Sequence, residues 1–308
     1  MTDGSTIGPQ DDSFHLATND DPWWIETNWF SFWVPERALS GTIYPWFRPN
    51  LGVAACAVAV WDDAAEQQWE VPYFDYQWQL PWPGGDLTKL ELDNGLTITC
   101  VEPLRRYEIG YAHEGLELEL RFDAVTEPHD VPLARMRFVG SAHFDQAGRV
   151  TGHMLLNGEK IAVDCYAMRD RSWGPRPDRG SVRSGYSSGT GSAGGFHSIT
   201  VAQGDDEPIL AGYLLRDGTM ADLVKGTRRV ERDNGRPTRV LIEGEDVLGR
   251  RFETEGRCAN RLAYHARPNI MTWMSLTEWR FDNDVIWGED QDVWSIDRWR
   301  DYAHSLPR

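Results

Sequence analysis

Apolar and polar residues alternate over short stretches along most of the chain. The clearest stretch is 116–122, where Leu and Phe alternate strictly with Glu and Arg. A period of two predicts a strand with one face on the core and one face in water. The pairs Asn94-Gly95, Asn157-Gly158 and Asn234-Gly235 separate such stretches, and both residue types tolerate the positive φ of a tight hairpin turn. The pattern therefore predicts antiparallel sheets.

Strand signals recur at short spacing in both halves of the chain, which is typical of a sandwich or barrel. The chain has 308 residues, the length of about two ordinary domains. We expect a flexible lead-in over residues 1–22 and two β domains over residues 23–147 and 148–308. A turn is expected over 143–149. Only residues 292–306 carry apolar side chains three or four positions apart, which predicts one short C-terminal helix.

The composition narrows the classes of partner. The formal net charge is −17, which repels the phosphates of nucleic acids and anionic lipid surfaces. Fifteen tryptophans are present, and indoles suit both large cores and the walls of apolar pockets. We therefore expect a hydrophobic small molecule as the ligand, and no nucleic acid. The sequence leaves the oligomeric state open.

The cysteines and the termini point to a reducing compartment. The four cysteines are far apart and lack C-x-x-C spacing, so buried free thiols are expected. The N-terminal stretch has neither a basic region nor an apolar region of a signal peptide. No window approaches eighteen uninterrupted apolar residues, so stable membrane insertion is not expected. The expected location is the cytoplasm.

One motif near the middle concentrates chemically active side chains: Asp170-Arg171-Ser172-Trp173-Gly174-Pro175-Arg176. In a structural interpretation, Asp170 pairs with Arg171 or Arg176 while Trp173 closes the end of a barrel. In a functional interpretation, Asp170 donates a proton or stabilises charge, and Trp173 faces the ligand. An indole face stabilises a developing cation, and an aspartate in an apolar wall has its pKa raised toward that of a useful acid.

Further candidates lie outside this motif. Tyr186 and His197 are candidate proton-transfer residues, although a packed Tyr and a structural His are the ordinary alternatives. Phe196, Trp29 and Glu278 are candidate substrate contacts, together with Arg171 and Trp173. The spacings H-E-x-x-H, His-x-His and clustered Cys/His do not occur, so no metal site is expected. A phosphate-binding or dinucleotide-binding glycine motif is also missing, and no cofactor is expected.

The central motif, with 184–186, Phe196-His197 and the stretch 29–50, resembles the AttH-like and hydroxyneurosporene synthase (carotenoid 1,2-hydratase) superfamily, most of all its uncharacterised bacterial branch. The resemblance covers the chain from about Trp23. It implies two lipocalin-like (calycin) antiparallel β-barrels packed together around a hydrophobic cavity. It also implies acid-initiated hydration or cyclisation of alkenes without a cofactor. Asp170, Trp173 and Gly174 match the family motif, whereas Arg171 replaces a histidine, and arginine does not shuttle protons at ordinary pH.

These observations leave three hypotheses. The leading one is a cofactor-independent lyase or isomerase that hydrates, dehydrates or cyclises an apolar terpenoid-like or steroid-like substrate. Asp170 would be the acid, and Tyr186 and His197 would position water or remove the final proton. The alternative is a lipocalin-type carrier that binds a hydrophobic molecule without changing it. A purely structural β-protein is the third.

Overall fold

The computed structural model describes residues 7–15, 17, 19–132, 141–177, 183–203 and 206–306. The chain forms two compact units. Unit 1 comprises Met1–Val34, Ser40–Val60 and Pro72–Pro177, and unit 2 comprises Pro35–Leu39, Trp61–Val71 and Asp178–Arg308. The division expected after residue 147 lies inside a long strand of unit 1, because the hairpin that follows it pairs with the first strand of the chain rather than with unit 2.

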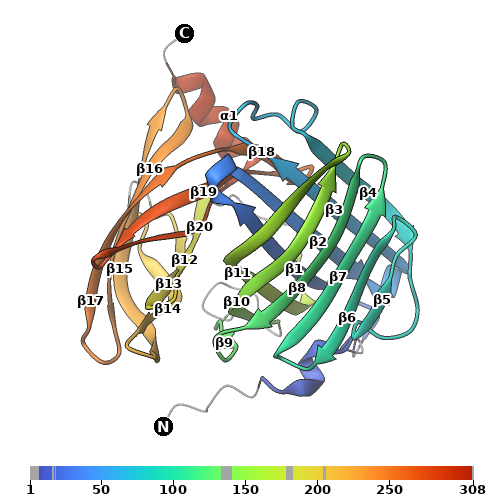
Figure 1. Cartoon of the computed structure of the whole chain (residues 1–308). Coiled ribbons are helices and arrows are strands. Elements are labelled where there is room, and N and C mark those ends of the chain that lie inside the picture. Colours follow the sequence, from blue (N-terminus) through green and yellow to red (C-terminus); the bar gives the residue numbers. More distant parts are fainter. Residues whose placement is uncertain are drawn as a thin grey trace. The chain divides into compact units, whose positions relative to one another are not determined.

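Unit 1 is an 11-stranded antiparallel sheet that curves strongly, with edges at β4 and β5 (Figure 1). In spatial order its strands are β4 (Tyr73–Pro81), β3 (Val53–Trp61), β2 (Leu39–Arg48), β1 (Trp24–Val34), β11 (Glu159–Pro175), β10 (Ala142–Leu156), β8 (Leu116–Ala124), β7 (Arg106–His113), β6 (Leu96–Glu102) and β5 (Lys89–Glu91). Strand β9 (His129–Asp130) pairs with β10. Short 3-10 turns are η1 (Pro9–Asp12), η2 (Pro35–Arg37) and η3 (Pro49–Leu51).

The hairpin signals in the sequence are confirmed at all three Asn-Gly pairs, because Asn94-Gly95 lies in the connection between the paired strands β5 and β6. Asn157 and Gly158 have φ angles of 50° and 87°, and they join β10 to β11. Asn234 and Gly235 have φ angles of 47° and 84° and join two strands of unit 2. Positive φ at both central residues gives the turn the twist that matches the flanking strands.

The concave side of the unit 1 sheet holds an apolar core and part of the N-terminal lead-in. Asp12 of η1 is buried, and its Oδ1 accepts hydrogen bonds from Nη1 and Nη2 of Arg169, both at 3.0 Å. Its Oδ2 accepts from the Leu104 amide at 2.6 Å and the Tyr107 hydroxyl at 2.5 Å. A buried carboxylate with four donors keeps its charge compensated. This segment of the lead-in is therefore fixed to unit 1.

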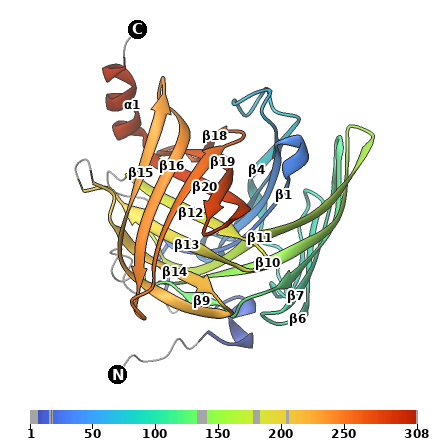
Figure 2. The same ribbon diagram turned by 60° about the vertical axis from the view of Figure 1, so that its left-hand side comes forward.

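Unit 2 is a closed antiparallel barrel (Figure 2). Its strands follow the order β17 (Arg251–Cys258), β16 (Arg236–Asp246), β15 (Thr219–Asp233), β14 (Ile209–Arg216), β13 (Gly194–Val201), β12 (Arg183–Thr190), β20 (Asp284–Ser295), β19 (Ile270–Phe281) and β18 (Leu262–Arg267). Additional pairing of β17 with β19 closes the barrel. The apolar interior includes Phe196, Trp279 and Phe281.

A helix ends the described chain. α1 (Ile296–Ser305) lies within the range 292–306 expected for the C-terminal helix. Residues 292–295, at the start of that range, belong to β20 instead. Trp299 and Tyr302 of α1 pack on Trp294, with ring centroids 5.6 Å and 5.0 Å away. The all-β class with one short terminal helix is confirmed, with a curved open sheet in unit 1 and a closed barrel in unit 2.

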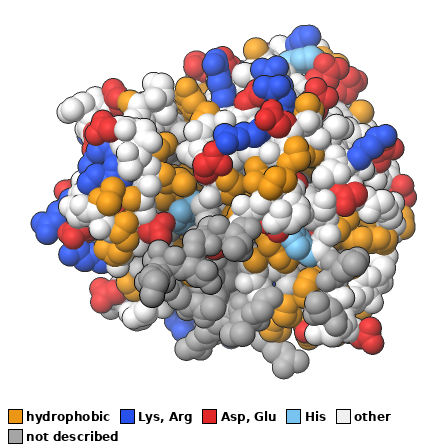
Figure 3. Space-filling view, turned by 90° about the horizontal axis from the view of Figure 1, so that it is seen from below, with side chains coloured by type: hydrophobic (Ala, Val, Ile, Leu, Met, Phe, Trp, Pro, Cys, Tyr) orange, Lys and Arg blue, Asp and Glu red, His pale blue; other side chains and the backbone are white. Residues whose placement is uncertain are grey.

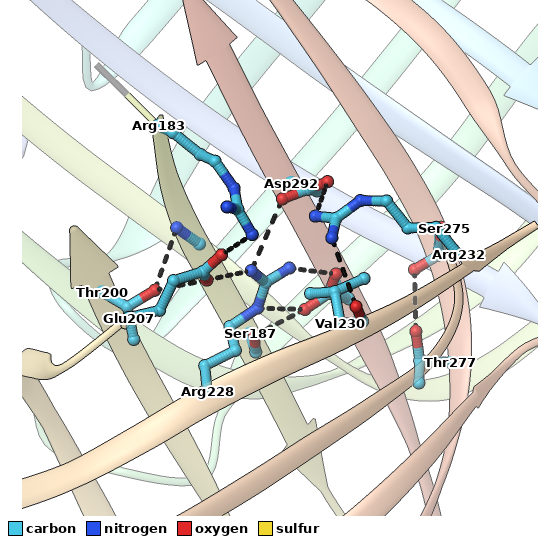
Figure 4. A network of polar contacts seen from close by, with 12 residues as sticks. Arg183, Ser187, Thr200, Glu207, Arg228, Val230, Arg232, Ser275, Thr277 and Asp292 are labelled. Atoms are coloured by element: carbon cyan, nitrogen blue, oxygen red, sulfur yellow. Dashed lines mark hydrogen bonds and ion pairs between the residues drawn. The ribbon is translucent and has the colours of Figure 1, made fainter. Parts of the chain in front are cut away.

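Charged side chains lie inside the unit 2 barrel as well as apolar ones (Figure 4). Arg228 is fully buried and donates to Oδ1 and Oδ2 of Asp290 at 3.1 Å and 2.7 Å, and to Oε2 of Glu207 at 2.5 Å. Arg232 donates to Oδ2 of Asp292 at 2.5 Å. These residues, with Arg183 bonded to Glu207, are called the Arg228 network below.

The surface carries charges of both signs. On the face drawn in Figure 3, acidic and basic side chains of the described residues are interspersed and do not form one continuous basic patch. In the part of the chain that the structure describes, no helix is long and apolar enough to cross a membrane.

Candidate functional site

Asp170 lies on β11, near the centre of the unit 1 sheet. Its Cα partner on β1 is Trp29, and its Cα partner on β10 is Asp145. Asp145 in turn pairs with His129 on β9. Paired residues in an antiparallel sheet place their side chains on the same face. The four side chains therefore form one row across four strands, which the sequence pattern alone did not bring together.

His143 lies on the same face of β10, two positions before Asp145. Its Nε2 lies 3.1 Å from Oδ1 of Asp145. Burial lowers the pKa of His143, but the neighbouring Asp145 and Asp170 carboxylates outweigh burial and raise the pKa above its ordinary value. We call Asp170, Asp145, His143 and Trp29 the Asp170 group.

The half-buried carboxyl of Asp170 has the chemical character of an acid. Burial raises its pKa from 3.8 to about 6, opposed by the charge of His143 and assisted by the charge of Asp145. A carboxyl with this pKa is partly protonated near neutral pH, so it can donate a proton and take it back. The neighbouring His143 then stabilises the carboxylate that remains.

Arg171 and Trp173 occupy the opposite face of β11 from Asp170. Nη2 of Arg171 donates to Oε2 of Glu26 at 2.7 Å. The Trp173 ring stacks on His15, with centroids 3.9 Å apart and planes 5° from parallel. Side chains an odd number of positions apart on a strand point to opposite faces. The expected pairing of the Asp170 acid with the Trp173 indole is therefore corrected, because neither Arg171 nor Trp173 shares the face of Asp170.

Trp29 is the indole on the face of Asp170. Its ring packs against Tyr44 of β2 in an edge arrangement, with centroids 5.1 Å apart. The side chain is 5% exposed, and its Nε1 is buried without a hydrogen-bond partner among the described residues. A buried indole N–H ordinarily has an acceptor. An oxygen atom of a bound molecule would supply that acceptor.

Tyr186 and His197 form a second group, in unit 2. They lie on the adjacent strands β12 and β13, with ring centroids 4.4 Å apart. Tyr213 on β14 is the Cα partner of His197, and its ring lies 5.8 Å from the imidazole. The two rings singled out in the sequence thus lie together, and their proposed roles in positioning water or removing a proton stay predictions.

Phe196 and Glu278 do not join the Tyr186–His197 pair, because Phe196, directly before His197 on β13, faces the other side of that strand and Glu278 lies on β19. Phe196 is fully buried in the barrel interior, where its ring meets Trp279 at 5.0 Å between centroids. Glu278 on β19 accepts a hydrogen bond from Nη2 of Arg257 at 3.2 Å. Core packing accounts for Phe196, and an outer-surface ion pair accounts for Glu278.

His143 and Asp145 are site residues that the sequence interpretation missed. Both lie in the stretch 143–149, where Asp, Gln, Ala and Gly suggested a turn, but the stretch is strand throughout. The strand forms because β10 has neighbours on both sides and pairs continuously with β11. The signal in the sequence is the spacing of His143 and Asp145, because two residues two positions apart on a strand lie on the same face.

The raised pKa of Asp170 predicts a pH-dependent effect on stability. The unfolded chain loses this proton near its ordinary pKa and the folded chain near 6, so this group favours folding below about pH 4 and loses that contribution as pH rises to 6. Asp170→Asn should therefore increase the free energy of unfolding at pH 7.5 by about 2–3 kcal/mol, and at pH 4.5 by about a third of that amount. Urea unfolding at both pH values measures this difference.

Asp164 on the same strand provides the control. It is exposed and paired with Arg149, with Nε to Oδ1 at 2.8 Å, and this partner lowers its pKa. Asp164→Asn should not stabilise the protein at either pH. A stabilisation by Asp170→Asn that is equal at both pH values would contradict a raised pKa at Asp170.

This fold occurs in solved structures of other proteins. A crystal structure described as a candidate AttH from Nitrosomonas europaea is 16% identical, with a TM-score of 0.62, and the match covers 94% of this chain and 97% of that chain. The kievitone hydratase from Nectria haematococca is 10% identical, with a TM-score of 0.55, and the match covers 88% and 89% of the two chains. These similarities confirm the AttH-like resemblance at the level of the fold.

Comparison with curated proteins finds no match. The pattern of one family, described as Domain of unknown function (DUF7064), matches residues 8–286. This range includes every strand of unit 1 and reaches into β20 of unit 2. The chain therefore belongs to the DUF7064 family.

Proposed function

We propose that the protein is a hydratase-type or cyclase-type lyase or isomerase, in which Asp170 protonates an alkene of an apolar substrate. The observation that carries the proposal is the Asp170 group, in which a carboxyl with a pKa of about 6 lies in register with Trp29 and beside His143 and Asp145. The name of the kievitone hydratase, whose fold is shared, supports the same class of reaction.

The chemistry requires only groups that the chain and water supply. The Asp170 carboxyl transfers its proton to one alkene carbon, and the other carbon becomes a cation. The face of a neighbouring indole stabilises positive charge, and Trp29 is the indole that pairs with Asp170 across the strands. In hydration, water bonds to the cation and its released proton restores the carboxyl. In cyclisation, a second alkene bonds to the cation, which forms a carbon–carbon bond and moves the positive charge to another carbon. In cyclisation and in isomerisation, a neighbouring C–H then gives its proton to the Asp170 carboxylate, which forms the product alkene and restores the acid.

His143 acts as a positioning and charge-balancing group in this proposal. When Asp170 has given up its proton, the carboxylate lies near an imidazole whose pKa is raised by the same acidic neighbours. A protonated His143 then stabilises the carboxylate, which lowers the free energy of the charge-separated state. The bond to Asp145 at 3.1 Å holds the imidazole in place.

Deuterium incorporation separates this enzyme from a carrier. Purified protein is incubated in D2O with geraniol, farnesol, geranylgeraniol or kievitone, and the recovered molecules are analysed by mass spectrometry and NMR. Protonation of an alkene by an acid that exchanges with solvent places at least one deuterium on carbon. A carrier returns every probe without carbon-bound deuterium. If the protein binds one or more of these molecules and none of them gains carbon-bound deuterium, the protein is a carrier and the proposed reaction fails.

A further inference from the structure

The face of unit 1 that carries Asp170 also carries a set of aromatic side chains, the aromatic belt. Its members are Trp29 of β1, Tyr44 and Trp46 of β2, and Tyr76 and Trp78 of β4. The rings of Tyr76 and Trp78 stack with centroids 4.6 Å apart and planes at 29°. Trp46 meets Trp78 edge-on at 5.6 Å, and its Nε1 donates to the Tyr76 hydroxyl at 3.1 Å.

The strand between β2 and β4 is built to hold these rings. On β3, Ala57 pairs with Tyr76 and Ala59 pairs with Phe74, so small side chains lie opposite aromatic ones. Ala55 packs in the same cluster as Trp46 and Ile25, with Tyr44 and Tyr76 packed against them. Because the alanine side chains of β3 are small, the aromatic rings of β2 and β4 can pack over that strand. The rings of β1, β2 and β4, with the alanines of β3 between them, therefore form a continuous apolar layer across four strands.

The two ends of the belt differ in exposure and polarity. Trp78 lies on the edge strand β4 and is 43% exposed. Trp29 is 5% exposed, pairs with Asp170, and has the buried Nε1 without a described partner. One end is thus an accessible aromatic surface, and the other end offers a hydrogen-bond donor beside an acid. Packing of the sheet alone requires neither an exposed indole at one end nor a buried indole N–H without an acceptor at the other.

We propose that the aromatic belt is the surface that binds the substrate and sets its length, with Trp78 and Tyr76 as specificity-determining residues. The inference rests on the proposed function of Asp170. Four interstrand steps separate β4 from β11, a distance of about 19 Å. The belt therefore suits an elongated unsaturated molecule with an oxygen acceptor near its reacting alkene, which the Trp29 N–H would bind. Short alkenes would fill only the Asp170 end.

A series of isoprenoid alcohols tests the length dependence. Binding of geraniol, farnesol and geranylgeraniol, each one isoprene unit longer, is measured by isothermal titration calorimetry. Trp78→Ala should weaken geranylgeraniol about tenfold, since one aromatic contact accounts for up to that factor, and should leave geraniol within about twofold. Tyr76→Ala removes the ring that stacks on Trp78, and it should likewise weaken geranylgeraniol more than geraniol.

Trp69→Ala is the matched control, because Trp69 is 76% exposed and belongs to unit 2. It should leave all three affinities unchanged. Circular dichroism and thermal unfolding of each variant verify that the fold is intact. Equal binding of geranylgeraniol by Trp78→Ala and the unchanged protein would overturn the proposal, as would equal weakening of all three alcohols.

The Trp29 end is tested with a pair of molecules that differ in one hydroxyl group. The unchanged protein should prefer farnesol to farnesene, and Trp29→Phe should lose that preference while still binding farnesene. A preference that survives in Trp29→Phe would overturn the role of this N–H.

The turnover of Asp170→Asn distinguishes failure of the belt from failure of the proposed reaction. If this variant keeps full turnover while Trp78→Ala loses geranylgeraniol, the reaction assignment fails and the belt stands as a binding surface. If it loses turnover and Trp78→Ala binds normally, the belt fails and the reaction assignment stands.

Discussion

Replacing Asp170 by asparagine is expected to reduce turnover by about a thousandfold, the range ascribed to a general acid in a transition state. Asparagine has nearly the shape of aspartate but no proton of suitable acidity to donate. The measurement is the initial rate at which carbon-bound deuterium appears in product in D2O. Substrate affinity should change much less than the rate, because the aromatic contacts of Trp29 and its neighbours remain.

The dependence of the rate on pH distinguishes an acid at Asp170 from a residue that only supports the fold. With a pKa of about 6, the protonated fraction of Asp170 falls about tenfold for each pH unit above that value. The rate of the unchanged protein should fall along the same limb, and the residual rate of Asp170→Asn should not. Asp164→Asn should keep both the rate and the profile, since Asp164 is exposed and paired with Arg149. Full activity in Asp170→Asn would remove the acid from the proposed mechanism.

Local patterns in the sequence were sufficient for the fold class. Alternation over 116–122 and the turns at Asn157-Gly158 and Asn234-Gly235 describe interactions between near neighbours, and the structure confirms them. The same alternation already separates Asp170 from Trp173, because an odd spacing on a strand reverses the face. Asp170 and Trp173 are close in the sequence, which suggested that they act together. On the strand, however, they lie on opposite faces.

The partners of Asp170 could not be read from local pattern. Trp29 is brought to Asp170 by pairing of β1 with β11, two strands far apart in the chain. Registers of this kind depend on which strands become neighbours, and a shift by one residue would move every side chain to the other face. Asp145 was hidden for a different reason, because turn-forming residue types occupy a strand that pairing on both sides keeps extended.

Removing the buried cation of the Arg228 network is expected to lower the free energy of unfolding strongly. In Arg228→Met, the buried carboxylates of Glu207 and Asp290 lose their shared partner. Breaking a buried ion pair on one side costs about 3–5 kcal/mol, a large share of the stability of an ordinary domain. Urea unfolding followed by tryptophan fluorescence and circular dichroism measures the loss.

The pH dependence of this loss identifies its electrostatic origin. The charges of Arg232 and Arg228 overcome burial and hold the pKa of Asp292 below its usual value. Asp292 therefore contributes stability above its unfolded pKa, and that contribution is lost as pH falls. Without Arg228 the buried carboxylates take up protons more readily, so the difference in stability between Arg228→Met and the unchanged protein should shrink from pH 7 to pH 4.5. Arg251→Met removes an arginine whose side chain is 80% exposed and whose partner is Glu245, and it should change the stability little at either pH. A loss in Arg228→Met that does not vary with pH would attribute the effect to packing rather than to charge.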